Sequence, residues 1–260
     1  MNPSGPALVL LADTPKQRRL EAQRLAARLE RALLSHLPDH SGPALLFTPE
    51  RVELRNLGAR SGPVYCDFVH GPNAHRQRYG GGRGQALARA CGVKPGTTPT
   101  ITDATAGLGR DAWALATLGC ALQAIEHDPY VHALLQDGLR RALAHPATRD
   151  IAARIQLHHA DALRRLPQAP QFDTVYLDPM FPAREKAAAV KKGMAMLQRL
   201  THTATDEAAL LAAARTCGAT RIAVKRPAKA QPLAGVPPHA SIPGKTVRYD
   251  LYRPTAQVNP

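Results

Sequence analysis

Several residue patterns are missing from this 260-residue chain, and each absence excludes a class of protein. The four cysteines form no Cys-x-x-Cys pair, which excludes a zinc knuckle and leaves reduced, partly buried thiols as the simplest interpretation. The eleven histidines form neither His-x-His nor His-Glu-x-x-His, so we expect no metal site. No apolar run approaches the roughly 20 residues of a membrane span.

The first residues lack the features of a secretory leader. No basic residue precedes the apolar stretch 7–11, and Asp13 ends that stretch early. Together with the cysteine pattern, this leads us to expect a cytoplasmic protein.

Acidic residues are scarce relative to basic ones. The chain has 34 Lys and Arg against 20 Asp and Glu, a formal net charge of +14. Basic side chains displace counterions from phosphates, so this excess favours a polyanionic partner such as a nucleic acid. A proteome that is basic throughout would produce the same charge without such a partner.

The order of the expected elements indicates an α/β fold in two parts. Short apolar segments around a helix at 15–37 indicate a small N-terminal α/β unit over residues 1–75. Over residues 76–260, strands alternate with helices, which predicts a Rossmann-like parallel sheet covered on both faces. The expected strands are 7–11, 44–47, 52–57, 64–69, 100–103, 121–126, 155–158, 174–177, 221–225 and 247–252. The other expected helices are 85–91, 110–118, 129–144, 162–166, 187–200 and 206–216, and the Pro-rich stretch 227–243 is expected to be a loop.

A glycine-rich turn follows the strand that ends at Asp103. Gly107, Gly109 and Ala112 form Gly-x-Gly-x-x-Ala between a strand and a helix, which is the setting of a nucleotide-binding turn. Carboxylates at Asp103 and Asp111 would repel a pyrophosphate but suit a cation. The pattern therefore favours S-adenosylmethionine, which has an ammonium and a sulfonium, over a dinucleotide. Asp111 could equally be only a favourable charge at a helix N-terminus.

Two more acids follow the next strands of the predicted sheet. Glu126 ends the second strand, where a carboxylate typically accepts both hydroxyls of a ribose. That role also fits NAD, so Glu126 does not separate the two cofactors. Asp161 follows the third strand and could accept the adenine amino group or simply cap the helix that begins at Ala162.

The most specific segment is Asp178-Pro179-Met180-Phe181, at the end of the fourth strand. It resembles the Asp/Asn-Pro-Pro-aromatic tetrapeptide of amino-group methyltransferases. The exocyclic amine of a base is a poor nucleophile because its lone pair is delocalised, and a carboxylate with a nearby carbonyl can hold its N–H bonds and favour a pyramidal nitrogen. Proline fixes the backbone, and Phe181 can stack on an extruded base. Asp-Pro is also a common turn dipeptide.

Taken in order, these motifs resemble the ribosomal RNA small-subunit methyltransferase J family. The resemblance spans about residues 44–253 and rests on AHRQRYGGGRG, DATAGLGRDA, the strand end at Glu126, YLDPMFP with AAAVKK, and VKRP. It implies a class I S-adenosylmethionine-dependent enzyme that methylates N2 of one guanosine in small-subunit rRNA. The cofactor positions that it implies are Arg110, Asp111, Glu126, His127, Asp161, Ala162 and Asp178. His127 stands where the family has Arg, and Asp161-Ala162 where it has small hydroxyl residues.

Three basic clusters are expected near the carboxyl ends of the strands, where an α/β sheet binds ligands. Our hypothesis is that they track RNA phosphates, although simple solvation is the alternative for each single charge. They are Arg76, Arg78 and Arg83 in the Gly-rich loop, Lys191 and Lys192 after the tetrapeptide, and Lys225, Arg226 and Lys229 after the fifth strand.

We expect direct transfer from the sulfonium to guanine N2, with Asp178 orienting the amine and rRNA or a 30S particle as partner. Two other functions remain open from the residues alone. A nicotinamide-dependent oxidoreductase could use the glycine turn but would leave the tetrapeptide without a role. A non-catalytic RNA-binding assembly factor could retain a vestigial cofactor site.

Overall fold

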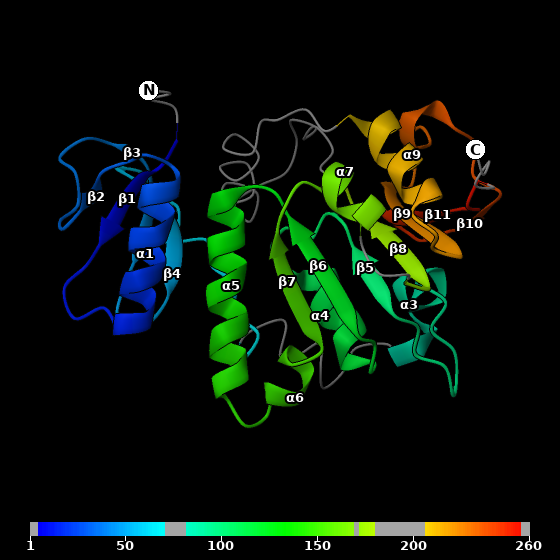
Figure 1. The fold of residues 1–260 in the computed structure, drawn as a ribbon, viewed down its shortest axis with the longest axis horizontal. Helices are drawn as coiled ribbons and strands as arrows, with labels where there is room; N and C mark the ends of the chain where they lie inside the picture. The colour runs from blue at the N-terminus through cyan, green and yellow to red at the C-terminus, as the bar shows by residue number, and fades with distance from the viewer. Residues whose placement is uncertain (1–4, 71–81, 169–171, 180–205, 256–260) are drawn as a thin grey trace. The chain divides into compact units, whose positions relative to one another are not determined.

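The computed structural model describes residues 5–70, 82–168, 172–179 and 206–255, which form two compact units (Figure 1). The N-terminal unit contains residues 5–67 together with 128–141. The sheet unit contains the other described residues.

The described part of the N-terminal unit contains a sheet of four strands in the order β2-β1-β3-β4. Strand β1 runs parallel to both of its neighbours, and β3 and β4 form an antiparallel hairpin. One face of helix α1 is buried through Ala22, Leu25 and Ala26, whose three- and four-residue spacing forms an apolar stripe. The elements are β1 (Ala7–Leu10), α1 (Lys16–Arg28), β2 (Leu33–Leu34), β3 (Gly42–Phe47), β4 (Val52–Leu57) and the larger part of α5 (Pro129–Ala144).

Two sequence predictions in this unit are wrong. The helix expected over 15–37 ends at Arg28, because Glu30 adopts a left-handed backbone with φ of 52°, and the chain then forms β2. The strand expected over 64–69 is reduced to one isolated bridge between Val64 and Leu54. Apolar composition alone had suggested regular structure in both segments.

A buried carboxylate on α5 organises the N-terminal unit. Asp137 is 0% exposed and accepts hydrogen bonds from Arg18 Nε at 2.9 Å, Arg141 Nε at 2.9 Å and the Val52 N–H at 3.0 Å. Arg140 donates to it as well. Burial alone would raise the pKa of Asp137, but the hydrogen bonds from Arg141 and Val52 and the charge of Arg18 outweigh it and lower the pKa.

The sheet unit confirms the expected α/β class. Seven strands of its described residues form one sheet in the order β10-β11-β9-β8-β5-β6-β7, in which the five from β9 to β7 are parallel. The chain order reverses between β5 and β8, and ligands bind outside the carboxyl ends of the strands at such a switch point. The strands are β5 (Ile101–Asp103), β6 (Leu122–Glu126), β7 (Ile155–His159), β8 (Thr174–Leu177), β9 (Arg221–Pro227), β10 (Ala240–Ile242) and β11 (Val247–Tyr252).

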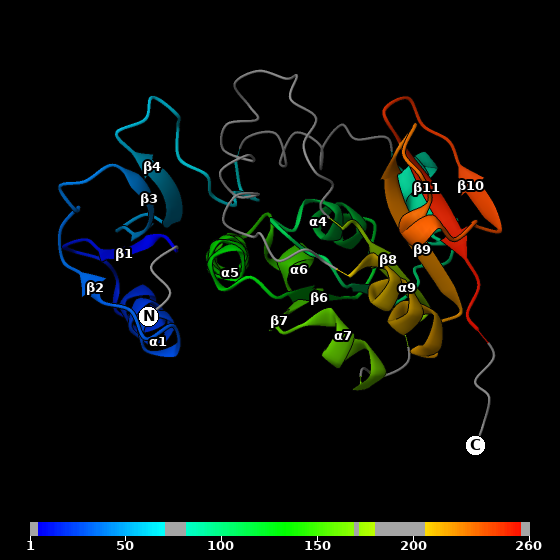
Figure 2. The ribbon, with the colours of Figure 1, turned by 90° about the horizontal axis from the view of Figure 1, so that it is seen from above.

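Helices cover both faces of this sheet (Figure 2). On one face, α3 (Ala86–Ala90) and α4 (Arg110–Thr117) bury Leu87 and Leu115 against Ile101 and Tyr176. On the other, α7 (Ala162–Arg165) and α9 (Glu207–Thr216) contribute to a core with Val175, Leu177, Ile222 and Val224. Short helices also occur at Gly82–Gly84, Arg149–Ala152, Leu166–Gln168 and Leu233–Gly235.

The sequence missed several short elements of the sheet unit, among them the helices at Gly82–Gly84 and Leu233–Gly235. Strand β10 lies within the stretch 227–243, expected to be a loop, and pairs antiparallel with β11. This strand is short and largely exposed, so its sequence lacks the alternation of apolar and polar residues that would predict a strand. Helix α6 (Arg149–Ala152) was also not expected. The helix expected over 187–200 lies outside the described residues. None of the helices in the described ranges has both the length and the hydropathy of a membrane crossing.

Candidate functional site

The glycine turn between β5 and α4 leaves open space beside its backbone. Gly107 and Gly109 have φ values of 53° and 71°, left-handed conformations that glycine adopts without strain. A Cβ added to Gly107 would meet nothing nearer than the Thr105 carbonyl oxygen, at 4.0 Å. The start of the turn is fixed by the Thr105 N–H, which donates to Asp103 Oδ1 at 3.1 Å. The turn thus exposes backbone to a ligand.

Glu126, at the end of β6, contacts this turn directly. Its Oε2 accepts from the Gly107 N–H at 2.8 Å, and its Oε1 lies 3.5 Å from His127 Nδ1. The His127 carbonyl lies 3.0 Å from His159 Nε2, at the end of the next strand. The carboxyl ends of β5, β6 and β7 therefore meet around the turn.

The tetrapeptide after β8 is hydrogen-bonded to the same turn. The Asp178 N–H donates to Thr105 Oγ1 at 2.6 Å, and Pro179 is buried. The backbone at the start of the tetrapeptide is therefore fixed two residues from Gly107. Met180 and Phe181 lie outside the described residues, so the stacking role expected for Phe181 stays a prediction.

A lysine from β9 connects the two motifs through their side chains. Lys225 Nζ lies 2.7 Å from Asp111 Oδ2 on α4 and 2.9 Å from Asp178 Oδ2 after β8. The Tyr176 hydroxyl donates to the same oxygen of Asp111 at 2.6 Å. Asp111 is thus more than a charge at a helix N-terminus, because it is the centre of a hydrogen-bond network.

We call Asp103, Asp111, Glu126 and Asp178 the acid cluster. Burial raises the pKa of Asp103 well above its usual range, and the other three carboxylates raise it further. Burial also raises the pKa of Asp178, while Lys225 opposes that rise. The cluster is an anionic environment with one ammonium among the described residues, which disfavours a pyrophosphate. The carboxylates of the acid cluster fit S-adenosylmethionine, whose ammonium and sulfonium are cationic.

The remaining expected cofactor residues lie at the same edge of the sheet. Arg110 is exposed at the start of α4. Asp161 caps α7, because its Oδ1 accepts from the Leu163 N–H at 2.9 Å, and Ala162 follows it half-buried. The capping interpretation of Asp161 is therefore observed, and its carboxylate keeps acceptor capacity for an adenine contact.

Two of the residues expected to bind RNA are engaged by carboxylates instead. Arg226 is 2% exposed, with Nη1 2.9 Å from Glu207 Oε1 and Nε donating to the Gln231 carbonyl. Its burial corrects the expectation that it contacts a phosphate. Lys225 binds Asp111 and Asp178, as described above. Lys229 is exposed after β9, and its contact with RNA stays a prediction. The remaining expected contacts are outside the described residues or, for Arg83, have an undescribed side chain: Arg76, Arg78, Arg83, Lys191 and Lys192.

Sequence reasoning missed the roles of Thr105, Tyr176 and Lys225. A partial signal existed, since Tyr176 and Asp178 are two residues apart and so share one face of β8. Lys225 could be added only by knowing that β9 lies beside β8, with Tyr176 opposite Ala223. Strand order is a property of the folded sheet, which the alternation of elements does not specify.

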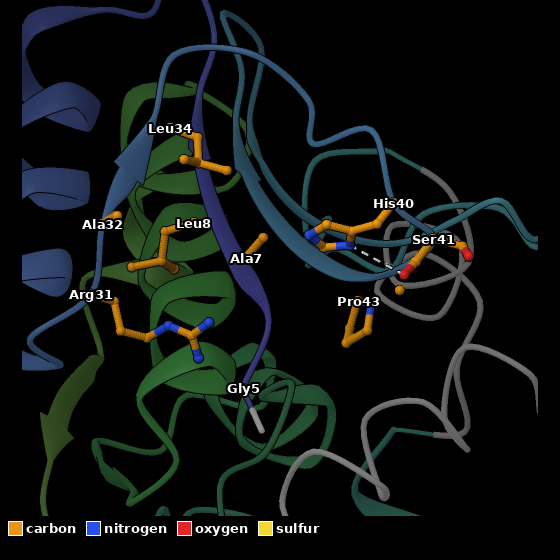
Figure 3. Close-up of a pocket in the computed structure, with 10 residues that line it drawn as sticks. Gly5, Ala7, Leu8, Arg31, Ala32, Leu34, His40, Ser41 and Pro43 are labelled. Atoms are coloured by element: carbon orange, nitrogen blue, oxygen red, sulfur yellow. Dashed lines mark hydrogen bonds between the residues drawn. The ribbon is translucent and has the colours of Figure 1, made fainter. Parts of the chain in front are cut away.

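A cavity of about 390 Å³ lies in the N-terminal unit (Figure 3). Its titratable side chains are Arg31 and His40, and His40 Nδ1 lies 3.3 Å from the Ser41 carbonyl. The described lining includes no carboxylate, and His40 contacts the Ser41 carbonyl rather than the Ser41 hydroxyl, so nothing in it suggests catalysis. Over the described ranges, no group of three or more His, Cys, Asp or Glu could hold a metal ion.

Several proteins similar to this chain are named as methyltransferases. A family model described as "Putative SAM-dependent methyltransferase" matches residues 27–254. The chain is 49% identical over 217 residues to ribosomal RNA small subunit methyltransferase J of Yersinia enterocolitica, covering 81% of this chain and 85% of that protein. It is 47% identical over 240 residues to the protein of that name in Edwardsiella ictaluri, covering 91% and 95%.

A solved structure is similar over nearly the whole chain. The SAM-dependent methyltransferase from Neisseria gonorrhoeae is 38% identical, with a TM-score of 0.76, and the match covers 95% of this chain and 96% of that one. The similarity therefore includes the N-terminal unit as well as the sheet unit.

Proposed function

The chain belongs to the family of S-adenosylmethionine-dependent methyltransferases, and on that premise we propose that it methylates the exocyclic N2 of a guanosine in small-subunit (16S) ribosomal RNA. The names of its relatives support the RNA class, and the tetrapeptide at Asp178 supports an amino group as acceptor. The net charge of +14 is consistent with a polyanionic substrate. We further propose that the enzyme acts in the cytoplasm, where ribosomal RNA is assembled into particles.

One observation supports this proposal more than any other: the hydrogen bond from the Asp178 N–H to Thr105 Oγ1, at 2.6 Å. It joins the glycine turn expected to bind the methyl donor to the tetrapeptide expected to bind the acceptor. A nicotinamide enzyme would have no use for this link. The glycine turn and the described start of the tetrapeptide both lie in the sheet unit. We therefore assign catalysis to the domain expected over residues 76–260.

The cofactor would be held at the carboxyl ends of β5, β6 and β7. Glu126 would accept hydrogen bonds from the ribose hydroxyls, and the acid cluster would attract the cationic end of the ligand. The open backbone at Gly107 would permit close approach. S-adenosylmethionine, when bound, supplies a methyl group activated by its positive sulfur.

Asp178 would act on the acceptor. Its carboxylate would accept an N–H of the guanine amino group, which directs the nitrogen lone pair away from the ring and towards the methyl donor. Positive charge develops on that nitrogen during transfer, and the negative carboxylate stabilises it at the place where it forms. The same carboxylate oxygen can accept the proton that the methylated nitrogen releases.

The test is transfer of a labelled methyl group to small-subunit rRNA from a strain that lacks this enzyme, followed by mapping of the methylated base. Free rRNA and 30S particles are offered separately. We expect one guanosine to be labelled at N2. Asp178→Ala should reduce the single-turnover rate by about 10²–10³-fold, the scale for losing a group that stabilises transition-state charge. Asp178→Asn keeps one acceptor oxygen and should fall between Ala and the native enzyme.

The matched control is Asp150→Ala, an exposed carboxylate on α6, which should transfer at the native rate. Full activity of Asp178→Ala would remove the mechanism. Label on another base or atom would remove the guanine-N2 assignment while leaving the enzyme class intact.

A further inference from the structure

Lys225 occupies an unusual position for a residue expected to contact RNA. Its ammonium lies within 3 Å of two carboxylates, Asp111 Oδ2 at 2.7 Å and Asp178 Oδ2 at 2.9 Å, and its side chain is 23% exposed. To reach a phosphate it would have to break two charge-assisted hydrogen bonds. It would also leave two half-buried carboxylates facing each other without a counterion.

The contact with Asp178 uses one oxygen only. Lys225 binds Oδ2, while no described residue donates a hydrogen bond to Oδ1, and the Asp178 side chain is 38% exposed. The carboxylate is therefore held on one side and accessible on the other. Its backbone is fixed independently by the hydrogen bond to Thr105.

We propose that Lys225 is a positioning residue for methyl transfer: it anchors Oδ2 of Asp178 so that Oδ1 is left, correctly turned, for the amino group of the target base. This inference rests on the function proposed above. Lys225 is itself anchored by Asp111, which accepts a hydrogen bond from the Tyr176 hydroxyl. The network thus extends from α4 through β9 to the tetrapeptide.

The charge of Lys225 is as important as its position. Although its burial opposes protonation, Asp178 and Asp111 outweigh that effect and raise the pKa of Lys225. It therefore remains an ammonium and cannot act as a general base. Its charge also opposes the rise in the pKa of Asp178 that burial causes, so it favours the ionised carboxylate, which can accept an N–H.

Other titratable groups near Asp178 either raise its pKa or carry no charge near pH 7. Asp111 from α4 raises the pKa of Asp178, and Asp103 from β5 is a further nearby carboxylate. The hydroxyls of Tyr176 on β8 and Tyr249 on β11 have raised pKa values, so both are neutral near pH 7. Cys91, beside α3, is likewise kept neutral by burial. Lys225 is thus the positive charge that acts on Asp178 from the described elements.

The experiment measures single-turnover methyl transfer to undermethylated small-subunit rRNA as a function of pH. It compares Lys225→Met, Lys225→Arg and the control Lys94→Met, an exposed lysine before the amino end of β5. We expect Lys225→Met to be slower by up to about 10²-fold, the scale for misplacing a reacting group. Its acid limb should move to higher pH, because Asp178 then binds a proton more readily. Lys225→Arg should restore the native acid limb and part of the rate, and Lys94→Met should be unchanged.

Binding measurements separate this role from a phosphate contact and from misfolding. For Lys225→Met we expect native affinity for S-adenosylhomocysteine within about threefold, and a native slope of RNA affinity against salt concentration. A native acid limb with a flatter salt slope would overturn the proposal in favour of an RNA contact. If Lys225→Met behaves as native while Asp178→Ala is inactive, the positioning role fails and the proposed function stands. If Asp178→Ala is active, the mechanism proposed for Asp178 fails and the positioning role of Lys225 fails with it, whereas label on another base or atom would contradict the proposed function.

Discussion

Asp137 and Asp178 are both carboxylates paired with cations, yet their surroundings differ in almost every respect. Asp137 has no exposed surface and receives hydrogen bonds from three arginines and a backbone N–H, which together lower its pKa. Asp178 is partly exposed, shares a single lysine with Asp111, and has a raised pKa. Asp137 is fully satisfied, whereas Asp178 keeps unused acceptor capacity.

This difference shows how a structural carboxylate can be told from a functional one. A buried ionised group stabilises a fold only when its partners offset the loss of hydration, and Asp137 meets that condition. A group that must bind a substrate cannot be saturated by its own protein. A carboxylate that is incompletely hydrogen-bonded at the carboxyl ends of the strands therefore indicates the functional site.

The most direct way to break the comparison is to remove Asp137. Asp137→Ala would leave Arg18 buried without its counterion, so we expect a loss of about 3–5 kcal/mol in the free energy of unfolding. Urea unfolding followed by circular dichroism measures this, with Asp150→Ala as the exposed control. The methyl-transfer rate per folded molecule should fall far less than in Asp178→Ala. If Asp137→Ala has the same urea unfolding midpoint as the native protein, the Asp137 network does not stabilise the fold.

A smaller effect is expected on the pH dependence of the free energy of unfolding when Asp137 and Asp178 are compared. Asp137 has a lowered pKa when folded, so its contribution to stability is present above its unfolded pKa of about 3.9 and is lost as the pH falls through the lower folded value. Asp178 has a raised pKa when folded, so as the pH falls through that folded value towards its unfolded pKa of about 3.9, protonation relieves a penalty and stabilises the fold. Unfolding free energies between pH 7 and 3 should show opposite changes in slope for Asp137→Ala and Asp178→Ala. Slopes that change in the same direction would contradict this.

The smallest effect is expected at Asp161, a third carboxylate that has one local partner. Because its Oδ1 caps α7 through the Leu163 N–H, Asp161→Ala should cost about 1 kcal/mol of stability. Affinity for S-adenosylhomocysteine, measured by calorimetry, should remain within about threefold of native. A loss of tenfold or more would place Asp161 with the functional acids and assign it the adenine contact. Asp161→Asn, which can still cap the helix, serves as the matched variant.

Much of the sheet unit was predictable because its central strands β5, β6 and β8 are buried on both faces and stand out as apolar runs. The strand ends at Asp103, Glu126 and Asp178 followed from the same pattern, because carboxyl ends of parallel strands meet at one edge. The exposed strand β10 was not predictable, since it has no apolar alternation. The end of α1 was missed because only the left-handed backbone at Glu30 marks it.

Within the site, sequence motifs identified residues that stand next to a recognisable turn. They did not identify Lys225, which reaches Asp178 only because β9 and β8 are adjacent. Arg226 was misjudged for a related reason. A basic residue at a strand end looks solvated in the sequence, but the partner that buries it, Glu207, comes from a helix 19 residues earlier.

The contribution of α5 to the N-terminal unit affects how the gene could be divided. A fragment ending near residue 75 would retain Arg18 and its contacts with the carbonyls of Thr48 and Pro49 but would lack Asp137. In such a fragment the buried Arg18 would lack its counterion. We therefore expect the fragment to be insoluble or unfolded when expressed alone. Any ancestor that acquired this unit by recombination would have needed the helix at 129–144 at the same time.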